Sequence, residues 1–154
     1  MTFDGLPLHP LIVHVLVAFV PLSALGTIAM AVRTSWRRSF EVPVLLLAVL
    51  CLLAVPVVRS SGDELAEAVH HQSSALEAHM SRADTVLPAM IVYVMLLAAA
   101  FVIGRRTARG DTTVALTRAS TIAVVLAAIS GLVATALVIW TGHAGATATW
   151  SGTL

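Results

Sequence analysis

Residues 119–141 read ASTIAVVLAAISGLVATALVIWT and contain no charged side chain. A membrane-spanning helix needs about 20 predominantly apolar residues, because it must cross roughly 30 Å of hydrocarbon. The stretch also lacks the alternation of apolar and polar residues that is typical of a half-buried strand. Lipid offers no partner for unpaired backbone groups, whereas a helix satisfies its own. The stretch therefore predicts a transmembrane helix.

Three more apolar stretches precede this one along the chain. They cover residues 8–32, 42–58 and 86–104. Four helices joined by short connections pack as an antiparallel bundle. We therefore predict an all-α fold, a membrane four-helix bundle that forms one domain over residues 1–154.

The composition of the whole chain agrees with a membrane protein and excludes several other classes. Of the 154 residues, 58% are hydrophobic and 11% are charged, and the mean hydropathy is +0.95. Soluble domains carry about 25% charged residues, so a soluble globular protein, a disordered chain and a nucleic-acid-binding protein are excluded. The single cysteine excludes an internal disulfide and a Cys-x-x-Cys haem attachment. No phosphate-binding loop, nucleophile elbow or zinc-protease motif is present, so no catalytic residue is predicted.

The basic residues, all of them arginine, are unevenly distributed between the two sides of the predicted bundle. Two arginines fall on the side of the termini, Arg59 and Arg82. The other seven lie in the connections on the opposite side: Arg33, Arg37, Arg38, Arg105, Arg106, Arg109 and Arg118. Because cytoplasmic connections of membrane proteins are enriched in Lys and Arg, we expect a multi-pass protein of the bacterial cytoplasmic membrane. Both termini and the central connection would face the periplasm or the exterior.

The central connection is predicted to contain an extra helix over about residues 63–82. Ser60-Ser61-Gly62-Asp63 is typical of a helix start. At about 100° per residue, four apolar side chains would share a stripe about 60° wide: Leu65, Val69, Leu76 and Met80. Such an amphipathic helix is expected to lie on the outer membrane surface or over the end of the bundle.

Histidines are the most informative residues of the chain. With the orientation above, all six fall in its outward half: His9, His14, His70, His71, His79 and His143. His14 lies within the first apolar stretch, and ionisable residues inside a membrane helix usually face the bundle interior with a partner. Helical periodicity lets His79 turn towards the bundle and directs His70 and His71 towards water. We expect His14, His79 and His143 to converge.

The opening residues 5–14, GLPLHPLIVH, resemble the start of the bacterial membrane-protein family catalogued as domain of unknown function 2231. That family has four predicted spans, a histidine in the central outer segment and a closing Gly-His-x-Gly. His79 and residues 142–145, Gly-His-Ala-Gly, match these two features. The resemblance covers nearly the whole chain and implies that the family's histidines are His9, His14, His79 and His143. Relatives joined to Rieske-type or cytochrome-type domains imply electron transfer, with a partner supplying the second redox centre.

Imidazoles gathered at one end of a bundle indicate a cofactor or metal site, because imidazole binds haem iron, copper and zinc. The preferred hypothesis is an electron-transfer subunit with one b-type haem, held by two of these histidines and preferably by a pair from His14, His79 and His143. Arg82, and also Arg59, would pair with haem propionates. In a first alternative, His9, His14, His79 and His143 hold a copper or zinc ion. In a second, the chain is a cofactor-free structural or assembly subunit whose histidines cap hydrogen bonds or respond to outward pH.

The expected partners follow from these hypotheses. They are the lipid bilayer and a membrane or periplasmic redox protein, with a second copy of the chain as a further candidate and no nucleic acid. A redox or accessory subunit fits the sequence better than a stand-alone enzyme.

Overall fold

The computed structural model describes residues 2–3, 6–68, 73–109 and 113–150. Four long helices account for most of them: α1 (Leu8–Val32), α2 (Arg37–Ala68), α3 (Ser74–Ala108) and α4 (Val114–Trp150). One turn of 3₁₀ helix, η1 (Thr34–Trp36), joins α1 to α2. A two-residue strand pair, β1 (Thr2–Phe3) and β2 (Leu6–Pro7), precedes α1 as a small antiparallel hairpin.

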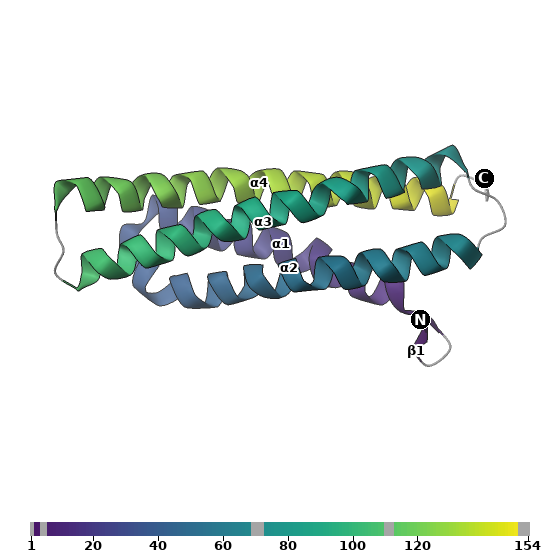
Figure 1. Ribbon diagram of the computed structural model, residues 1–154, viewed down its shortest axis with the longest axis horizontal. Helices are drawn as coiled ribbons and strands as arrows, with labels where there is room; N and C mark the ends of the chain where they lie inside the picture. The colour runs from purple at the N-terminus through teal and green to yellow at the C-terminus, as the bar shows by residue number, and fades with distance from the viewer. Residues whose placement is uncertain (1, 4–5, 69–72, 110–112, 151–154) are drawn as a thin grey trace.

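The four helices form one elongated antiparallel bundle, as Figure 1 shows. Helix α1 packs against α2 and α4, and α3 packs against the same two helices, so α1 and α3 lie on a diagonal. All four helices are long and apolar enough to cross a membrane. The predicted all-α bundle is therefore confirmed, and the chain is a multi-pass membrane protein with four candidate spans.

The extra amphipathic helix predicted over residues 63–82 does not exist as a separate element, and that prediction is wrong. Helix α2 continues to Ala68, and α3 begins at Ser74 after Ser73, whose hydroxyl accepts a hydrogen bond from the Leu76 N–H at 3.2 Å. The residues of α2 after Gly62 are mostly good helix formers, and one glycine costs only about 1 kcal/mol in a helix. The helix therefore continues past Ser60–Asp63 instead of restarting there.

The predicted stripe is divided between two helices as a result. Leu65 lies in α2, and Leu76 and Met80 lie in α3. Val69, together with His70 and His71, falls outside the described residues.

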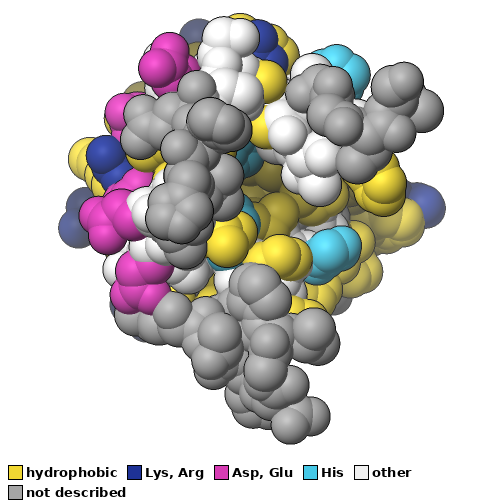
Figure 2. Space-filling model, turned by 90° about the vertical axis from the view of Figure 1, so that its right-hand side faces the viewer, with side chains coloured by type: hydrophobic (Ala, Val, Ile, Leu, Met, Phe, Trp, Pro, Cys, Tyr) yellow, Lys and Arg dark blue, Asp and Glu magenta, His cyan; other side chains and the backbone are white. Residues whose placement is uncertain are grey.

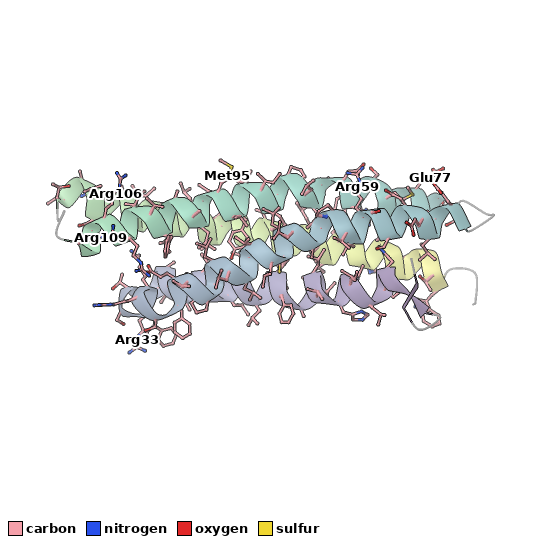
Figure 3. All side chains as sticks on the ribbon, turned by 60° about the horizontal axis from the view of Figure 1, so that its bottom comes forward. Arg33, Arg59, Glu77, Met95, Arg106 and Arg109 are labelled. Atoms are coloured by element: carbon pink, nitrogen blue, oxygen red, sulfur yellow. The ribbon has the colours of Figure 1, made fainter. Side chains whose placement is uncertain are left out.

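The two ends of the bundle differ in chemistry. We call the end where α1 begins and α4 finishes the histidine end, because it holds His9, His79 and His143; Figure 2 looks straight at it. We call the opposite end, formed by residues 30–41, 97–109 and 113–124, the arginine end. Figure 3 shows Arg33, Arg106 and Arg109 at the arginine end, and Arg59 and Glu77 at the other. The structure thus retains the uneven distribution of charge that the sequence predicted.

Apolar side chains cover the middle of the bundle on its outside. Leu50, Leu53 and Met95 are 62%, 63% and 66% exposed, and Figure 3 shows Met95 pointing away from the helices. A continuous apolar surface of this kind would promote aggregation in water. It is the expected outer surface of helices that are surrounded by lipid.

Small residues and one aromatic ring form the centre of the bundle. The buried face of α4 contains Ala123, Ala127, Gly131 and Ala134, and small residues of this kind let membrane helices approach closely. Tyr93 of α3 is the largest fully buried side chain of the described residues. A Cβ on Gly131 would lie 2.9 Å from Cε2 of Tyr93, so this glycine provides the space that the ring occupies.

Candidate functional site

The histidine end brings all four helices together around a mixed polar surface. Figure 2 shows acidic side chains gathered on one side of this face, and histidine side chains both at its edge and deeper between the helix ends.

His9 of α1 is held by the neighbouring helix α2. Its Nδ1 lies 2.9 Å from the carbonyl oxygen of Val58 and 3.3 Å from Oγ of Ser61. Ser61 is only 4% exposed and donates its own hydroxyl proton to the same carbonyl at 2.9 Å. Because a carbonyl oxygen only accepts, Nδ1 of His9 carries the proton, and in the neutral ring the Nε2 lone pair is left for a ligand.

His79 of α3 is held in the same way by α4. Its Nδ1 lies 2.9 Å from the carbonyl oxygen of Thr141. The same argument assigns the proton to Nδ1 and leaves Nε2 as the ligand atom of the neutral ring. The two halves of the chain, α1–α2 and α3–α4, therefore each supply one imidazole whose Nδ1 lies 2.9 Å from a carbonyl oxygen of the neighbouring helix.

A glycine lies against each of these two rings. A Cβ on Gly62 would lie 2.9 Å from Cε1 of His9, and a Cβ on Gly145 would lie 3.0 Å from Cε1 and Nδ1 of His79. Each glycine follows the carbonyl acceptor by four residues in the same helix, since Gly62 follows Val58 and Gly145 follows Thr141. The imidazole can reach the helix carbonyl because the residue one turn further on has no side chain.

The two held histidines lie next to each other. The ring centroids of His9 and His79 are 6.3 Å apart, and the ring planes meet at 88°. Both rings are half-buried. Helices α1 and α3 lie on the diagonal of the bundle, so the pair sits between the ends of the four helices.

The other predicted site histidines are placed differently. His14 is exposed, and its Nδ1 hydrogen-bonds the carbonyl oxygen of Pro10 in its own helix. His143 is exposed on α4. His9 and His14 are five residues apart, which turns them by about 140° around the helix, so only one of them can face the bundle centre. The structure brings together His9 and His79, and it does not bring His14 and His143 into this pair.

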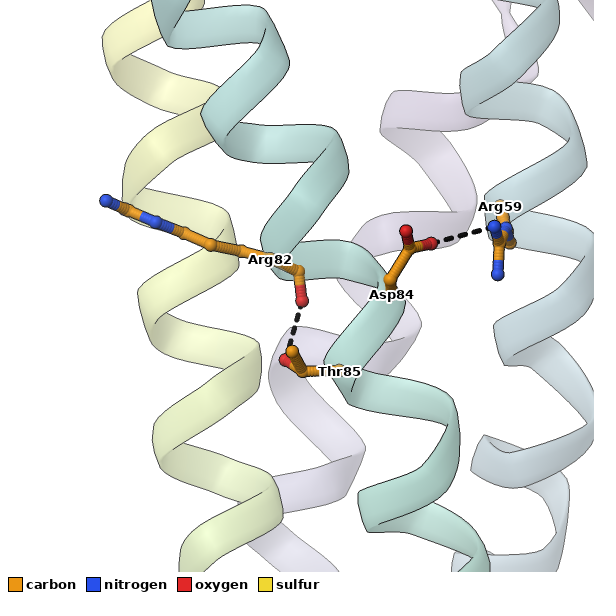
Figure 4. Close-up of polar contacts among 4 residues, drawn as sticks. All are labelled: Arg59, Arg82, Asp84 and Thr85. Carbon is orange, nitrogen blue, oxygen red and sulfur yellow. Dashed lines mark hydrogen bonds and ion pairs between the residues drawn. The ribbon is translucent and has the colours of Figure 1, made fainter.

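The arginines expected near the site make contacts within the protein. The Arg82 guanidinium lies over the Trp140 ring, 4.2 Å from its centroid, and Nη1 is 3.4 Å from the Trp140 carbonyl oxygen. Arg59 forms an ion pair with Asp84 at 2.8 Å, between side chains that are 51% and 56% exposed. Figure 4 shows the two arginines pointing to different helices, with Arg82 directed over α4. Exposed pairs such as Arg59–Asp84 contribute about 1 kcal/mol at most.

Several residues of this arrangement carry no recognisable signal in the sequence. Ser61 and Gly62 are typical of a helix start, and their role against His9 follows only from the packing of α1 on α2.

A polar cluster in the middle of the bundle was also not predicted. There the Tyr93 hydroxyl lies 2.8 Å from Oγ1 of Thr27 and 3.3 Å from Oγ of Ser23. A lone tyrosine within an apolar stretch was the available signal.

Among the residues that the structure describes, there is no group of three or more His, Cys, Asp or Glu side chains that could hold a metal ion. The candidate site therefore consists of two oriented imidazoles.

The comparisons with known proteins agree with the architecture. No curated protein and no solved structure matches the chain. The family model described as predicted membrane protein (DUF2231) matches residues 5–154, which includes the opening GLPLHPLIVH and the closing Gly-His-Ala-Gly. The chain therefore belongs to the DUF2231 family of predicted membrane proteins.

Proposed function

We propose that this chain is an integral-membrane electron-transfer subunit that binds a b-type haem through His9 and His79. The observation that carries the proposal is that the two imidazoles have the same hydrogen-bonding state. Each donates Nδ1–H to a helix carbonyl at 2.9 Å and leaves Nε2 for a ligand. This second hydrogen bond is typical of metal-bound histidine, because it fixes the tautomer and the ring orientation.

The number of donors favours haem over a bare ion. A haem iron needs at most two protein ligands, because the macrocycle supplies the others. A structural zinc site needs four protein ligands and a catalytic one needs three. His9 and His79 supply two, and no group of three such ligands occurs in the described part of the chain.

The distance between the rings also fits a shared iron. A metal ion lies about 2 Å from an imidazole nitrogen, so two imidazoles that share one ion would have centroids no more than roughly 6 Å apart. The centroids of His9 and His79 lie 6.3 Å apart. Oγ1 of Thr141, the residue whose carbonyl holds His79, is buried without a hydrogen-bond partner among the described residues, which fits a polar group bound at this end.

The remaining residues would orient and shield the group. Bound haem supplies one-electron chemistry, and the protein sets ligand geometry and the surrounding dielectric. Arg82 remains the candidate for a propionate, because a guanidinium has five N–H donors and the contact with the Trp140 carbonyl uses one. A membrane or periplasmic redox protein would be the electron-transfer partner.

Histidine variants test this proposal directly. The chain is expressed with added haem, purified in detergent and examined by optical absorption, with thermal unfolding as the control for folding. Wild type is expected to show a Soret band. His9→Ala and His79→Ala are each expected to bind at least about tenfold less haem, because each would lack one of the two imidazoles proposed to hold it. His14→Ala is the matched control and should keep the band.

Three results would overturn the assignment. A wild-type protein without a Soret band would exclude haem, and a folded His79→Ala variant with full haem content would exclude this pair. Copper or zinc bound at about one ion per chain and lost in His9→Ala would instead support the ion-binding alternative. If neither haem nor metal is bound, the pair serves a structural or assembly subunit.

We also propose that the histidine end faces the periplasm or the exterior of a bacterial cytoplasmic membrane. The arginine excess at the opposite end supports this orientation. Exposed Thr147 lies on the histidine side and exposed Ser39 on the arginine side, so each is a site for an introduced cysteine. In intact cells, a membrane-impermeant maleimide should label Thr147→Cys and should label Ser39→Cys only after lysis. The opposite pattern would reverse the orientation.

A further inference from the structure

The arginine end contains a cavity of about 620 Å³ that the proposed haem site does not use. It lies between the ends of α2, α3 and α4, with Met30 of α1 at one side. Ligand-binding pockets commonly have volumes of about 300–1,000 Å³. The cavity is therefore large enough for part of a lipid or for a small amphiphilic molecule.

The polar part of the cavity lining is strongly positive. Four arginines line it: Arg37, Arg38, Arg105 and Arg109. Glu41 is the only carboxylate among the described lining residues, and it pairs with Arg105 at 2.7 Å. The Glu41 side chain is only 15% exposed, so this pair is partly removed from solvent. Positive side chains therefore exceed negative ones by three among the described lining residues.

Arg37 provides an independent indication that the cavity can bind an anion. Its Nε donates to the Met30 carbonyl oxygen at 3.0 Å, which fixes the position of the guanidinium. Its Nη2 is buried and has no hydrogen-bond partner among the described residues. A buried N–H group without an acceptor is costly, and the cost is larger for a charged group. An anion bound in the cavity would supply the acceptor.

The rest of the lining is apolar and indicates what the anion is attached to. Met30, Leu97, Phe101 and Val124 form this part of the wall. A free inorganic anion would gain nothing from these side chains, whereas a hydrocarbon chain would be in contact with them. Basic pockets between membrane helices on the cytoplasmic side bind anionic head groups.

We propose that this cavity binds an anionic phospholipid, with its phosphate at Arg37 and the neighbouring arginines and its acyl chain against Met30, Leu97 and Phe101. The phosphate would accept from the Nη2 group of Arg37, which has no hydrogen-bond partner among the described residues. The proposal is independent of the haem proposal, because the two sites are at opposite ends of the bundle.

The chain offers a matched control for general charge attraction. Arg106 belongs to the same end but does not line the cavity, and Figure 3 shows it pointing away from the bundle. Arg109 is exposed like Arg106 but is one of the lining residues. Replacing either arginine by glutamine removes the same charge. A difference in lipid binding between the two variants therefore isolates the contribution of the cavity.

Native mass spectrometry of the full chain in neutral detergent tests the proposal with three probes: phosphatidylglycerol, phosphatidylcholine with the same acyl chains, and inorganic phosphate. Wild type is expected to retain phosphatidylglycerol in preference to phosphatidylcholine. Arg37→Gln and Arg109→Gln should each weaken phosphatidylglycerol binding about fivefold, and Arg106→Gln by less than about twofold, because one cationic contact to an anionic head group is lost only in the first two.

Each other outcome contradicts part of the proposal. Equal losses in Arg109→Gln and Arg106→Gln would mean that lipid associates with surface charge and not with the cavity. Displacement of the lipid by millimolar inorganic phosphate would identify a soluble phosphate compound as the ligand. Equal retention of the two lipids would exclude recognition of the anionic head group. If Arg37→Gln does not fold, the comparison of Arg109→Gln with Arg106→Gln still decides the question.

Discussion

Replacement of Tyr93 by alanine is expected to destabilise the bundle by about 3 kcal/mol, at the lower end of the range for truncating a buried aromatic ring. The side chain is 0% exposed and packs against α4, where Gly131 provides its space. Removing the ring leaves a cavity in the centre of the bundle. The effect is placed at the lower end because helices in lipid associate through packing, without the additional gain from excluding water.

The hydroxyl group of Tyr93 is expected to matter much less than its ring. It lies within hydrogen-bonding distance of Thr27 and Ser23. These two residues also donate to helix carbonyls, Thr27 to Ser23 and Ser23 to Val20, each at 2.9 Å. Tyr93→Phe therefore leaves neither of their protons unpaired and should cost less than about 1 kcal/mol, as for other hydrogen bonds between membrane helices.

Unfolding of the purified chain in mixed micelles with increasing dodecyl sulfate measures both variants of Tyr93. A large loss for Tyr93→Ala with a small loss for Tyr93→Phe would establish that packing dominates. Equal losses of stability for the two variants would contradict this. They would mean that the hydrogen bonds of the hydroxyl group contribute more to stability than the packing of the ring.

Gly145→Ala is expected to disrupt the site, and Gly142→Ala is expected to leave it intact. A Cβ at position 145 would lie 3.0 Å from Cε1 and Nδ1 of His79, whereas a Cβ at position 142 meets nothing within 4 Å. Both substitutions gain the same helix propensity, up to about 1 kcal/mol relative to glycine. The difference between the variants therefore isolates the contact with the imidazole.

The measured quantities are haem content and stability. If His79 binds haem as proposed, Gly145→Ala should lower haem content at least about tenfold, because the displaced ring would lose its Thr141 hydrogen bond and with it the fixed position of Nε2. It should also be at least about 1 kcal/mol less stable than Gly142→Ala, the net value of one hydrogen bond. If the two variants behave alike, the glycine contact has no role in holding His79. Gly62→Ala should reproduce the effect at His9, where the Cβ distance is 2.9 Å.

The wrong prediction of a separate helix over residues 63–82 shows what local sequence signals cannot decide. Ser60-Ser61-Gly62-Asp63 has the composition of a helix start, but a helix that has already formed continues through such residues unless something terminates it. Here Gly62 instead provides the space against which the His9 ring packs. The same residue types support both interpretations, and only the neighbouring helix distinguishes them.

The placement of His14 shows a second limit. Its position inside an apolar stretch favoured an inward direction, because a polar group in lipid needs a partner. The carbonyl of Pro10, one turn earlier in the same helix, provides that partner. An imidazole that hydrogen-bonds a carbonyl oxygen of its own helix can remain on the outside of the bundle.

The number of helices and the uneven distribution of arginines could be determined from the sequence, because hydrophobic length and charge are properties of consecutive residues. The pairing of His9 with His79, the space for Tyr93 at Gly131 and the arginine-lined cavity became visible only in the assembled bundle. These features depend on how each helix is rotated about its axis and how far it is shifted along its neighbours. That rotation and shift are set by side-chain packing between distant parts of the chain, which no stretch of sequence contains by itself.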